Sequence, residues 1–175
     1  MTYGPAVASC VWALLALPAI ASAQGSAASA ARADVEITPY VSLGSSTSWG
    51  AGGAVRWPVV RALSLELDTS YRRAEIGALN ASANLLYDVA TVGRATPYVA
   101  AGIGLDQYGT PEVTEAGVGT RGRTGLAVNA GGGVRVRADE SWGIRADARW
   151  INGLGSKSGE RWRIYNGITF NPGRR

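Results

Sequence analysis

The chain of 175 residues has no histidine, one cysteine, one lysine and no apolar run longer than about ten residues. Histidine is the usual general base of serine hydrolases, so its absence argues against that chemistry. With Cys10 as the only thiol, a disulfide within the chain and a cysteine metal site are excluded. A membrane-spanning helix needs about 20 apolar residues, which no segment provides. The sequence therefore predicts no metal and no cofactor, and any passage through a membrane must use strands.

Residues 1–23 contain no charged side chain, and the apolar run 11–20 is followed by the tripeptide Ala-Ser-Ala. A short apolar run before a small-x-small pattern is typical of a secretory signal peptide, cleaved here after Ala23. An N-terminal membrane anchor is the alternative, but the run is about half as long as a spanning helix requires. Residues 24–34 are small and polar and are predicted to form a flexible lead-in.

From residue 35 onward, apolar residues alternate with polar ones. In residues 142–151, WGIRADARWI, every second side chain is apolar and three of the five between them are charged. A period of two predicts a β-strand with two unlike faces. The same pattern, interrupted by turn residues, predicts eight strands: 35–43, 49–57, 63–71, 76–87, 97–107, 126–136, 142–151 and 161–170. Pro58 is expected to end the second strand, and residues 76–87 would also suit a short amphipathic helix.

Eight strands of about ten residues without helical connections predict an all-β fold, an eight-stranded antiparallel up-and-down transmembrane β-barrel. The barrel is predicted over residues 35–170, with a C-terminal tail at 171–175. The longest polar segments, 109–123 and 152–159, are predicted to be loops on the outer side, and the other connections to be short. Long outer loops and short periplasmic turns are typical of outer-membrane barrels.

Bulky aromatic residues bracket three of these strands. The pairs are Trp49 with Trp57, Trp142 with Trp150, and Trp162 with Phe170, each eight residues apart and so on one face. At about 3.3 Å per residue this spans roughly 26 Å along the strand, or about 20 Å of height after a tilt of about 40°. The apolar band of outer-membrane barrels is about 25 Å tall. The six rings are therefore predicted at the two membrane interfaces, although a soluble barrel would place them in its core.

The opposite faces of the strands hold six acidic residues and eight arginines. In a membrane barrel these faces line the lumen. The side chains predicted to form ion pairs there are Glu66, Asp68, Arg135, Arg145, Asp147, Arg149 and Arg163. Asp147 is expected to pair with an arginine of a neighbouring strand, such as Arg135 or Arg163. Glu66 and Asp68 would also suit a catalytic acid and base, but carboxylates that form ion pairs with arginines across the lumen are the more common arrangement.

Three segments resemble a known family: TPYVAAGIGL (96–105), GGGVRVRADESWGIRADARW (131–150) and YNGITF (165–170). They look like the small eight-stranded bacterial outer-membrane β-barrels, similar to the membrane domain of outer membrane protein A. The resemblance implies a bacterial outer-membrane location and a structural or surface-interaction role. It also implies recognition of the C-terminal strand by the barrel-assembly machinery. Such chains typically end on an aromatic residue, which Phe170 matches, whereas residues 171–175 follow it here.

These observations predict a non-enzymatic outer-membrane barrel with an envelope-integrity or surface-interaction role. Its partners would be outer-membrane lipid and, through Arg121, Arg123 and Lys157 of the predicted outer loops, lipopolysaccharide phosphates. No nucleic-acid partner is predicted, because the arginines are dispersed through the strands despite a net charge of +4. Two alternatives stay open, a secreted soluble barrel that binds a small apolar ligand and a narrow gated pore. The sequence does not specify an oligomeric state.

Overall fold

The computed structural model describes residues 35–45, 48–73, 77–114, 117–154 and 160–172. The predicted signal peptide (1–23) and lead-in (24–34) lie outside the described residues, as do Lys157 and the last three residues of the predicted tail. In the described part, no helix is long and apolar enough to cross a bilayer.

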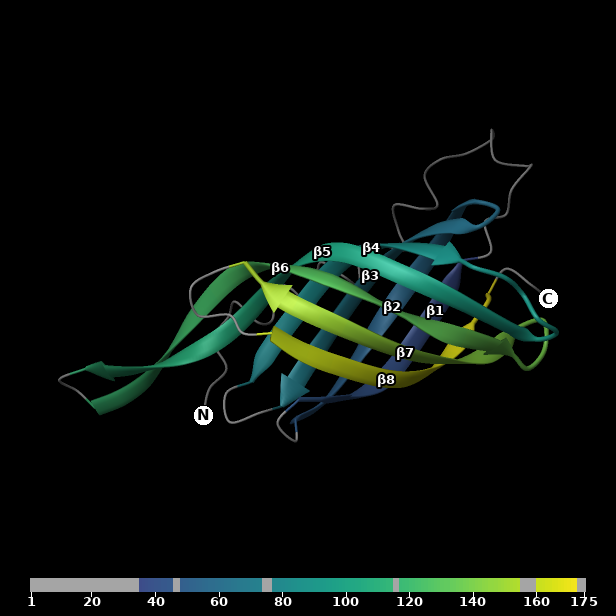
Figure 1. The fold of residues 1–175 in the computed structure, drawn as a ribbon. Helices are drawn as coiled ribbons and strands as arrows, with labels where there is room; N and C mark the ends of the chain where they lie inside the picture. Colours follow the sequence, from purple (N-terminus) through teal and green to yellow (C-terminus); the bar gives the residue numbers. More distant parts are fainter. Residues whose placement is uncertain (1–34, 46–47, 74–76, 115–116, 155–159, 173–175) are drawn as a thin grey trace, which may run out of the picture. The chain divides into compact units, whose positions relative to one another are not determined.

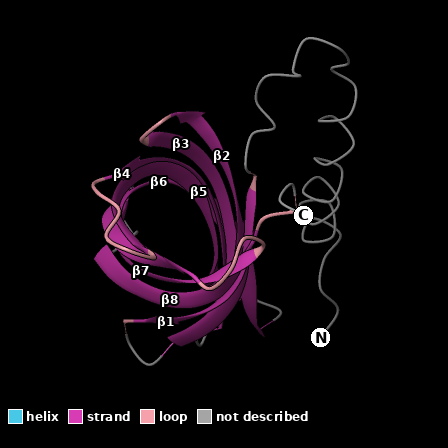
Figure 2. Ribbon diagram, turned by 90° about the vertical axis from the view of Figure 1, so that its right-hand side faces the viewer, coloured by secondary structure: helices cyan, strands magenta, loops and turns pink. Residues whose placement is uncertain are grey.

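The described residues form eight strands. They are β1 (Glu36–Gly44), β2 (Ser48–Val60), β3 (Leu63–Arg73), β4 (Ala78–Asp88), β5 (Ala95–Thr114), β6 (Gly117–Arg137), β7 (Trp142–Gly153) and β8 (Glu160–Phe170). Each pairs antiparallel with the next, and β8 pairs antiparallel with β1, which closes the barrel (Figures 1 and 2). The predicted eight-stranded antiparallel up-and-down barrel is confirmed.

The barrel has two ends, which the register defines. Ile37 pairs with Phe170, so the start of β1 and the end of β8 lie at one end, together with the β2–β3, β4–β5 and β6–β7 connections. We call this the turn end. The opposite end, where β5 and β6 extend as a long hairpin, is the ribbon end (Figure 1).

The expected end of the second strand at Pro58 was wrong. β2 does not end before Pro58 but continues to Val60, with a register shift between these two residues. A proline is tolerated there because a bulge near a strand end does not need its missing N–H. The strand predicted over residues 76–87 is confirmed as β4, and its alternative, a short helix, is excluded because the polar positions all face the lumen at a period of two.

The predicted outer loop 109–123 is also wrong in its described part. β5 and β6 pair continuously from Ala95↔Val136 to Thr114↔Gly117, so the segment forms a two-stranded ribbon. It continues past the last pair of β5 with β4, Ala78↔Tyr108, by six residues, or about 20 Å. The polar composition indicated a loop, but the β-branched residues of this segment favour extended backbone, and pairing satisfies their backbone N–H and C=O groups.

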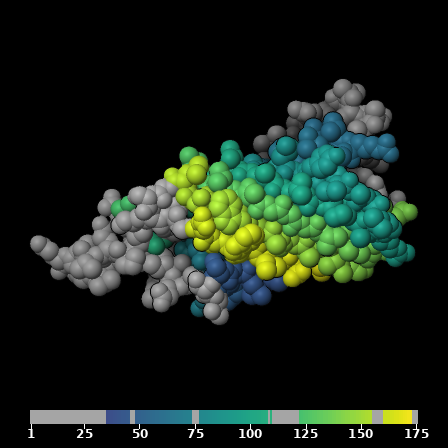
Figure 3. Space-filling model, viewed as in Figure 1, coloured from purple at the N-terminus to yellow at the C-terminus, as the bar shows by residue number. Residues whose placement is uncertain are grey.

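The barrel is apolar outside and polar inside. The exposed outward residues include Val41, Leu43, Ile103, Leu126, Ile144, Ile164 and Ile168, whereas the buried residues are mostly polar or charged. Figure 3 shows part of this outer wall, over β5 to β8. Two of the described outward-facing residues in the barrel strands are charged. They are Arg73 and Glu160, and both lie at the ribbon end. A surface of this size and polarity suits hydrocarbon rather than water.

Candidate functional site: the charged lumen

Inward-facing residues form four charged layers along the barrel. From the turn end, the turn-end layer contains Glu36, Arg56, Asp88 and Arg135, and the central layer contains Glu66, Arg145, Asp147 and Arg149. The upper layer contains Asp68 and Arg163, and the mouth layer contains Arg72, Asp106 and Arg161. The first three layers each hold equal numbers of arginines and carboxylates.

The central layer is a closed set of ion pairs. Glu66 of β3 accepts hydrogen bonds from Arg145 and, at 2.7 Å, from Arg149. Asp147 accepts from Arg149 at 3.0 Å and from Arg145 at 3.1 Å, and Asn84 donates to Glu66 at 3.4 Å. All four charged side chains are at most 1% exposed. Buried charges of this kind are tolerated because each guanidinium meets two carboxylates.

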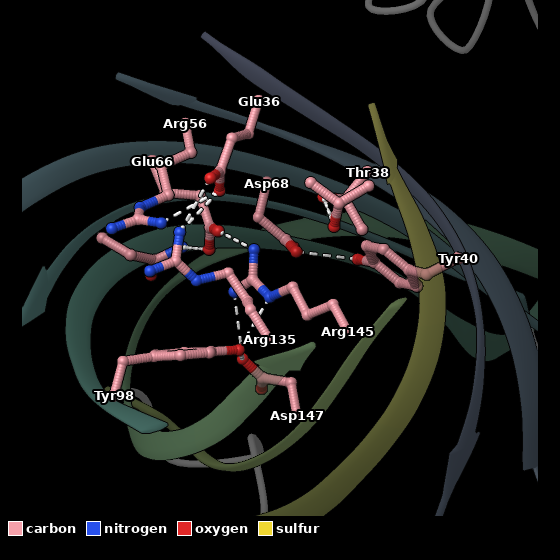
Figure 4. Close-up of polar contacts among 12 residues, drawn as sticks. Glu36, Thr38, Tyr40, Arg56, Glu66, Asp68, Tyr98, Arg135, Arg145 and Asp147 are labelled. Carbon is pink, nitrogen blue, oxygen red and sulfur yellow. Dashed lines mark hydrogen bonds and ion pairs between the residues drawn. The ribbon is translucent and has the colours of Figure 1, made fainter. Parts of the chain in front are cut away.

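Tyrosine rings separate and cover these arginines. Arg145 lies 4.9 Å from the ring centroid of Tyr98 and 5.4 Å from that of Tyr165. Tyr165 stacks on Tyr40 with 4.1 Å between centroids. The hydroxyls of Tyr98 and Tyr165 donate to Asp147, at 2.5 and 3.2 Å (Figure 4 shows Tyr98 and Asp147). Cation–π contacts and these hydrogen bonds hold the guanidinium groups in place.

The layers on either side of the central layer also consist of ion pairs between arginines and carboxylates. In the turn-end layer, Arg56 and Arg135 each bond both Glu36 and Asp88, at 2.7 to 2.9 Å (Figure 4 shows Arg56, Arg135 and Glu36). In the upper layer, Arg163 bonds Asp68 at 3.1 Å, and Tyr40 donates to the same carboxylate at 2.8 Å. These contacts join β1, β2, β3, β4, β6 and β8 across the lumen.

Glycines make the room for this network. A Cβ at Gly52 would lie 2.6 Å from the ring of Tyr40, and one at Gly133 would lie 2.5 Å from the hydroxyl of Tyr98. The run at 131–133, which has no phosphate-loop spacing, therefore places glycine beside the central layer. Small inward residues allow large side chains of other strands to cross a narrow barrel.

The structure places the seven predicted lumen residues inside the barrel but corrects one pairing. Asp147 pairs with Arg145 and Arg149 of its own strand, not with Arg135 or Arg163. Side chains two residues apart on one strand face the same side, and both long arginines bend toward the shorter aspartate. Arg135 belongs to the turn-end layer, and Arg163 pairs with Asp68.

The six predicted interface aromatics face outward near the two ends of the strands. Trp150 is paired with Trp162 at the ribbon end, and Trp142 with Phe170 at the turn end. Trp49 lies at the ribbon end of β2, with the guanidinium of Arg73 6.0 Å from its ring, and Trp57 lies toward the turn end. Of the three predicted lipopolysaccharide contacts, Arg123 is exposed on the ribbon, while the side chains of Arg121 and Lys157 lie outside the described part.

Sequence reasoning missed the neutral members of the network, Tyr40, Tyr98, Tyr165 and Asn84. A signal was present, because each tyrosine occupies an inward position with at least one small residue two positions away on its strand, such as Ser42 for Tyr40, Ala100 for Tyr98 and Gly167 for Tyr165. Tyrosine is common on either face of a barrel, so this signal is weak by itself. In the described part, no cluster of acidic side chains is placed to hold a metal ion.

No family model matches the chain, and no curated protein matches it. Solved structures do match. The N-terminal β-barrel domain of Pseudomonas aeruginosa OprF is 20% identical with a TM-score of 0.65, covering 78% of this chain and 95% of that one. Neisserial surface protein A, NspA, is 13% identical with a TM-score of 0.63 and the same two coverages. The outer membrane enzyme PagL is 12% identical with a TM-score of 0.53, covering 77% and 98%.

This chain has the fold of the small eight-stranded outer-membrane barrels. The resemblance inferred from residues 96–105, 131–150 and 165–170 is therefore confirmed in fold. Because the outer membrane enzyme PagL shares this fold, the fold does not decide the activity, and the chemistry of the lumen has to be judged from its own residues.

Proposed function

We propose that this protein resides in the bacterial outer membrane and acts as a non-enzymatic barrel, with a role in envelope integrity or in presenting its ribbon to the surroundings. The single observation that carries the proposal is the central layer. Its four charged side chains come from opposite walls of the barrel, are at most 1% exposed and form ion pairs with one another. Such a layer ties the walls together and blocks the lumen.

Three features favour this role over the alternatives. A soluble carrier of apolar ligands would need an apolar interior, whereas the described lumen is lined by charged and polar groups. A pore would need an open path through the central layer. Enzymes of the outer membrane need a reactive group, and the chain has no histidine, while Glu36, Glu66, Asp68, Asp88, Asp106 and Asp147, the described carboxylates inside the barrel, are each hydrogen-bonded to arginine.

Cell fractionation with heat-modifiable gel mobility tests the location and the fold together. The expected result is recovery with outer-membrane vesicles and a mobility that changes on boiling. Recovery in the soluble periplasmic or extracellular fraction without a mobility change would refute the proposal.

Liposome swelling tests the blocked lumen. Vesicles containing the purified protein should swell in small sugars no faster than protein-free vesicles. A large-pore porin serves as the positive control, and swelling at a comparable rate would favour the pore alternative instead.

A further inference from the structure

The mouth layer differs from the other three in its charge. Asp106 accepts two hydrogen bonds from Arg161, at 2.6 and 2.7 Å, and one from Asn80 at 2.6 Å. This one carboxylate therefore faces two arginines, Arg161 and Arg72, and Arg72 forms no ion pair with the described residues. In each of the other three layers the number of arginines equals the number of carboxylates. The mouth layer has two arginines and one carboxylate, so it carries one positive charge in excess.

The two arginines of the mouth layer line a pocket at the ribbon end. The pocket has a volume of about 30 Å³ and is lined by Arg72, Arg161, Arg163, Asp106 and Asn80 together with Ser42, Ser48 and Ser70, of which Ser48 donates its O–H to the carbonyl oxygen of Ser45. The aliphatic part of Arg72 leans across the pocket, since its Cδ lies 3.9 Å from the position of a Cβ at Gly44. The volume admits about two or three water-sized groups.

Two serine side chains border the same space. Ser42 and Ser70 line the pocket, and Ser70 accepts a hydrogen bond from Arg163, which leaves its own O–H free to donate. Arg163 itself is 7% exposed and already donates to Asp68 and Ser70. Arginine and hydroxyl donors that converge on one small space are suited to a tetrahedral oxyanion.

We propose that this pocket binds a phosphate or sulfate group, with Arg72 as the charge that the ligand neutralises and Arg161 and the hydroxyls of Ser42 and Ser70 as further donors. Inorganic oxyanions and the phosphomonoester of a lipid headgroup share this chemistry. The site does not depend on the proposed function, because the probe is offered directly to the folded barrel.

The test measures binding of inorganic phosphate to the full chain, refolded in phosphatidylcholine vesicles, by ³¹P line broadening. Arg72→Gln is expected to weaken binding about tenfold or more, the loss of a charge-assisted hydrogen bond. Arg73→Gln is the matched control, because Arg73 is adjacent on β3 but faces outward over Trp49. Heat-modifiable mobility shows that both variants fold.

A second arm distinguishes the two sources of the ligand. In this arm the vesicles contain phosphatidic acid, and inorganic phosphate is present as before. The phosphatidic acid should compete with inorganic phosphate if a lipid headgroup reaches the pocket, and should not compete if only a free ion enters. Either result supports the site. Equal binding by the Arg72 and Arg73 variants, or no binding by the unmutated protein, overturns it.

Discussion

The guanidinium of Arg149 lies 2.7 Å from the carboxylate of Glu66, although 83 residues separate them in the chain. Glu66 belongs to β3 and Arg149 to β7, which are opposite each other in the ring of eight strands. The contact therefore spans the lumen, and both side chains are fully buried. A network that crosses the barrel in this way makes the folding of the two walls mutually dependent.

Glu66→Gln should destabilise the barrel strongly. The variant leaves Arg145 and Arg149 with one buried carboxylate between them, and breaking a buried pair costs about 3–5 kcal/mol. Reversible urea unfolding in lipid vesicles measures the change. Glu160→Gln, at an exposed position of β8, is the control and should change stability by less than about 1 kcal/mol. Similar losses for the two variants would contradict the buried network.

Gly52→Ala and Gly53→Ala should differ sharply although they are neighbours. A methyl group at Gly52 would lie 2.3 Å from the carbonyl oxygen of Thr69 and 2.6 Å from the ring of Tyr40, whereas the nearest atom to one at Gly53 is 3.9 Å away. Overpacking of this kind costs about 1–3 kcal/mol. The same unfolding assay should show the loss for Gly52→Ala and little change for Gly53→Ala. Equal stabilities would mean that the lumen is looser than described.

Ala148→Arg tests which solvent meets the outer face. Ala148 is exposed in the middle of β7, between Gly132 and Ile164 of the adjacent strands. An arginine near the centre of a bilayer destabilises a barrel by about 2–4 kcal/mol, and one near the interface by at most about 1 kcal/mol. Leu154→Arg, exposed just past the ribbon end of β7, is the interface control. A negligible effect at Ala148 would indicate that this face meets water.

Trp162 should lie at headgroup depth. It is 59% exposed and opposes Trp150 across β7 and β8 at the ribbon end. A variant that keeps Trp162 as its only tryptophan should be quenched strongly by lipids brominated near the headgroup and weakly by lipids brominated at the chain ends. Efficient quenching by aqueous iodide alone would place the ring in water and count against a membrane interface there.

Asp139 should make the β6–β7 turn sensitive to acid. The backbone N–H of Ser141 (2.7 Å) is the largest cause that lowers the pKa of Asp139 below its ordinary 3.8; the Ser141 hydroxyl and the N–H of Trp142 contribute as well. Because folding favours the ionised form, its contribution is present above the ordinary value and is lost as the pH falls through the lowered one. NMR titration should show the lowered midpoint, and amide exchange at Ser141 should rise below it. Asp139→Asn should abolish that rise, and its persistence would exclude this carboxylate.

Local patterns were enough to predict the strands and their faces. The alternation in residues 142–151 and the spacing of Trp150 from Trp142 are properties of one strand, so a period of two identifies them without knowledge of the rest of the chain. The inward direction of Glu66, Arg145 and Arg149 follows from the same period. The number of strands and the absence of helical connections then determine an antiparallel barrel.

Only the tertiary structure decided which inward groups meet. Glu66 reaches Arg149, and Tyr98 reaches Asp147, because the stagger of a closed barrel sets the height of each strand relative to all the others. That stagger depends on the pairing of all eight strands at once, and no single strand encodes it. The ribbon of β5 and β6 was decided in the same way, since backbone pairing between two segments outweighed the polar composition of each.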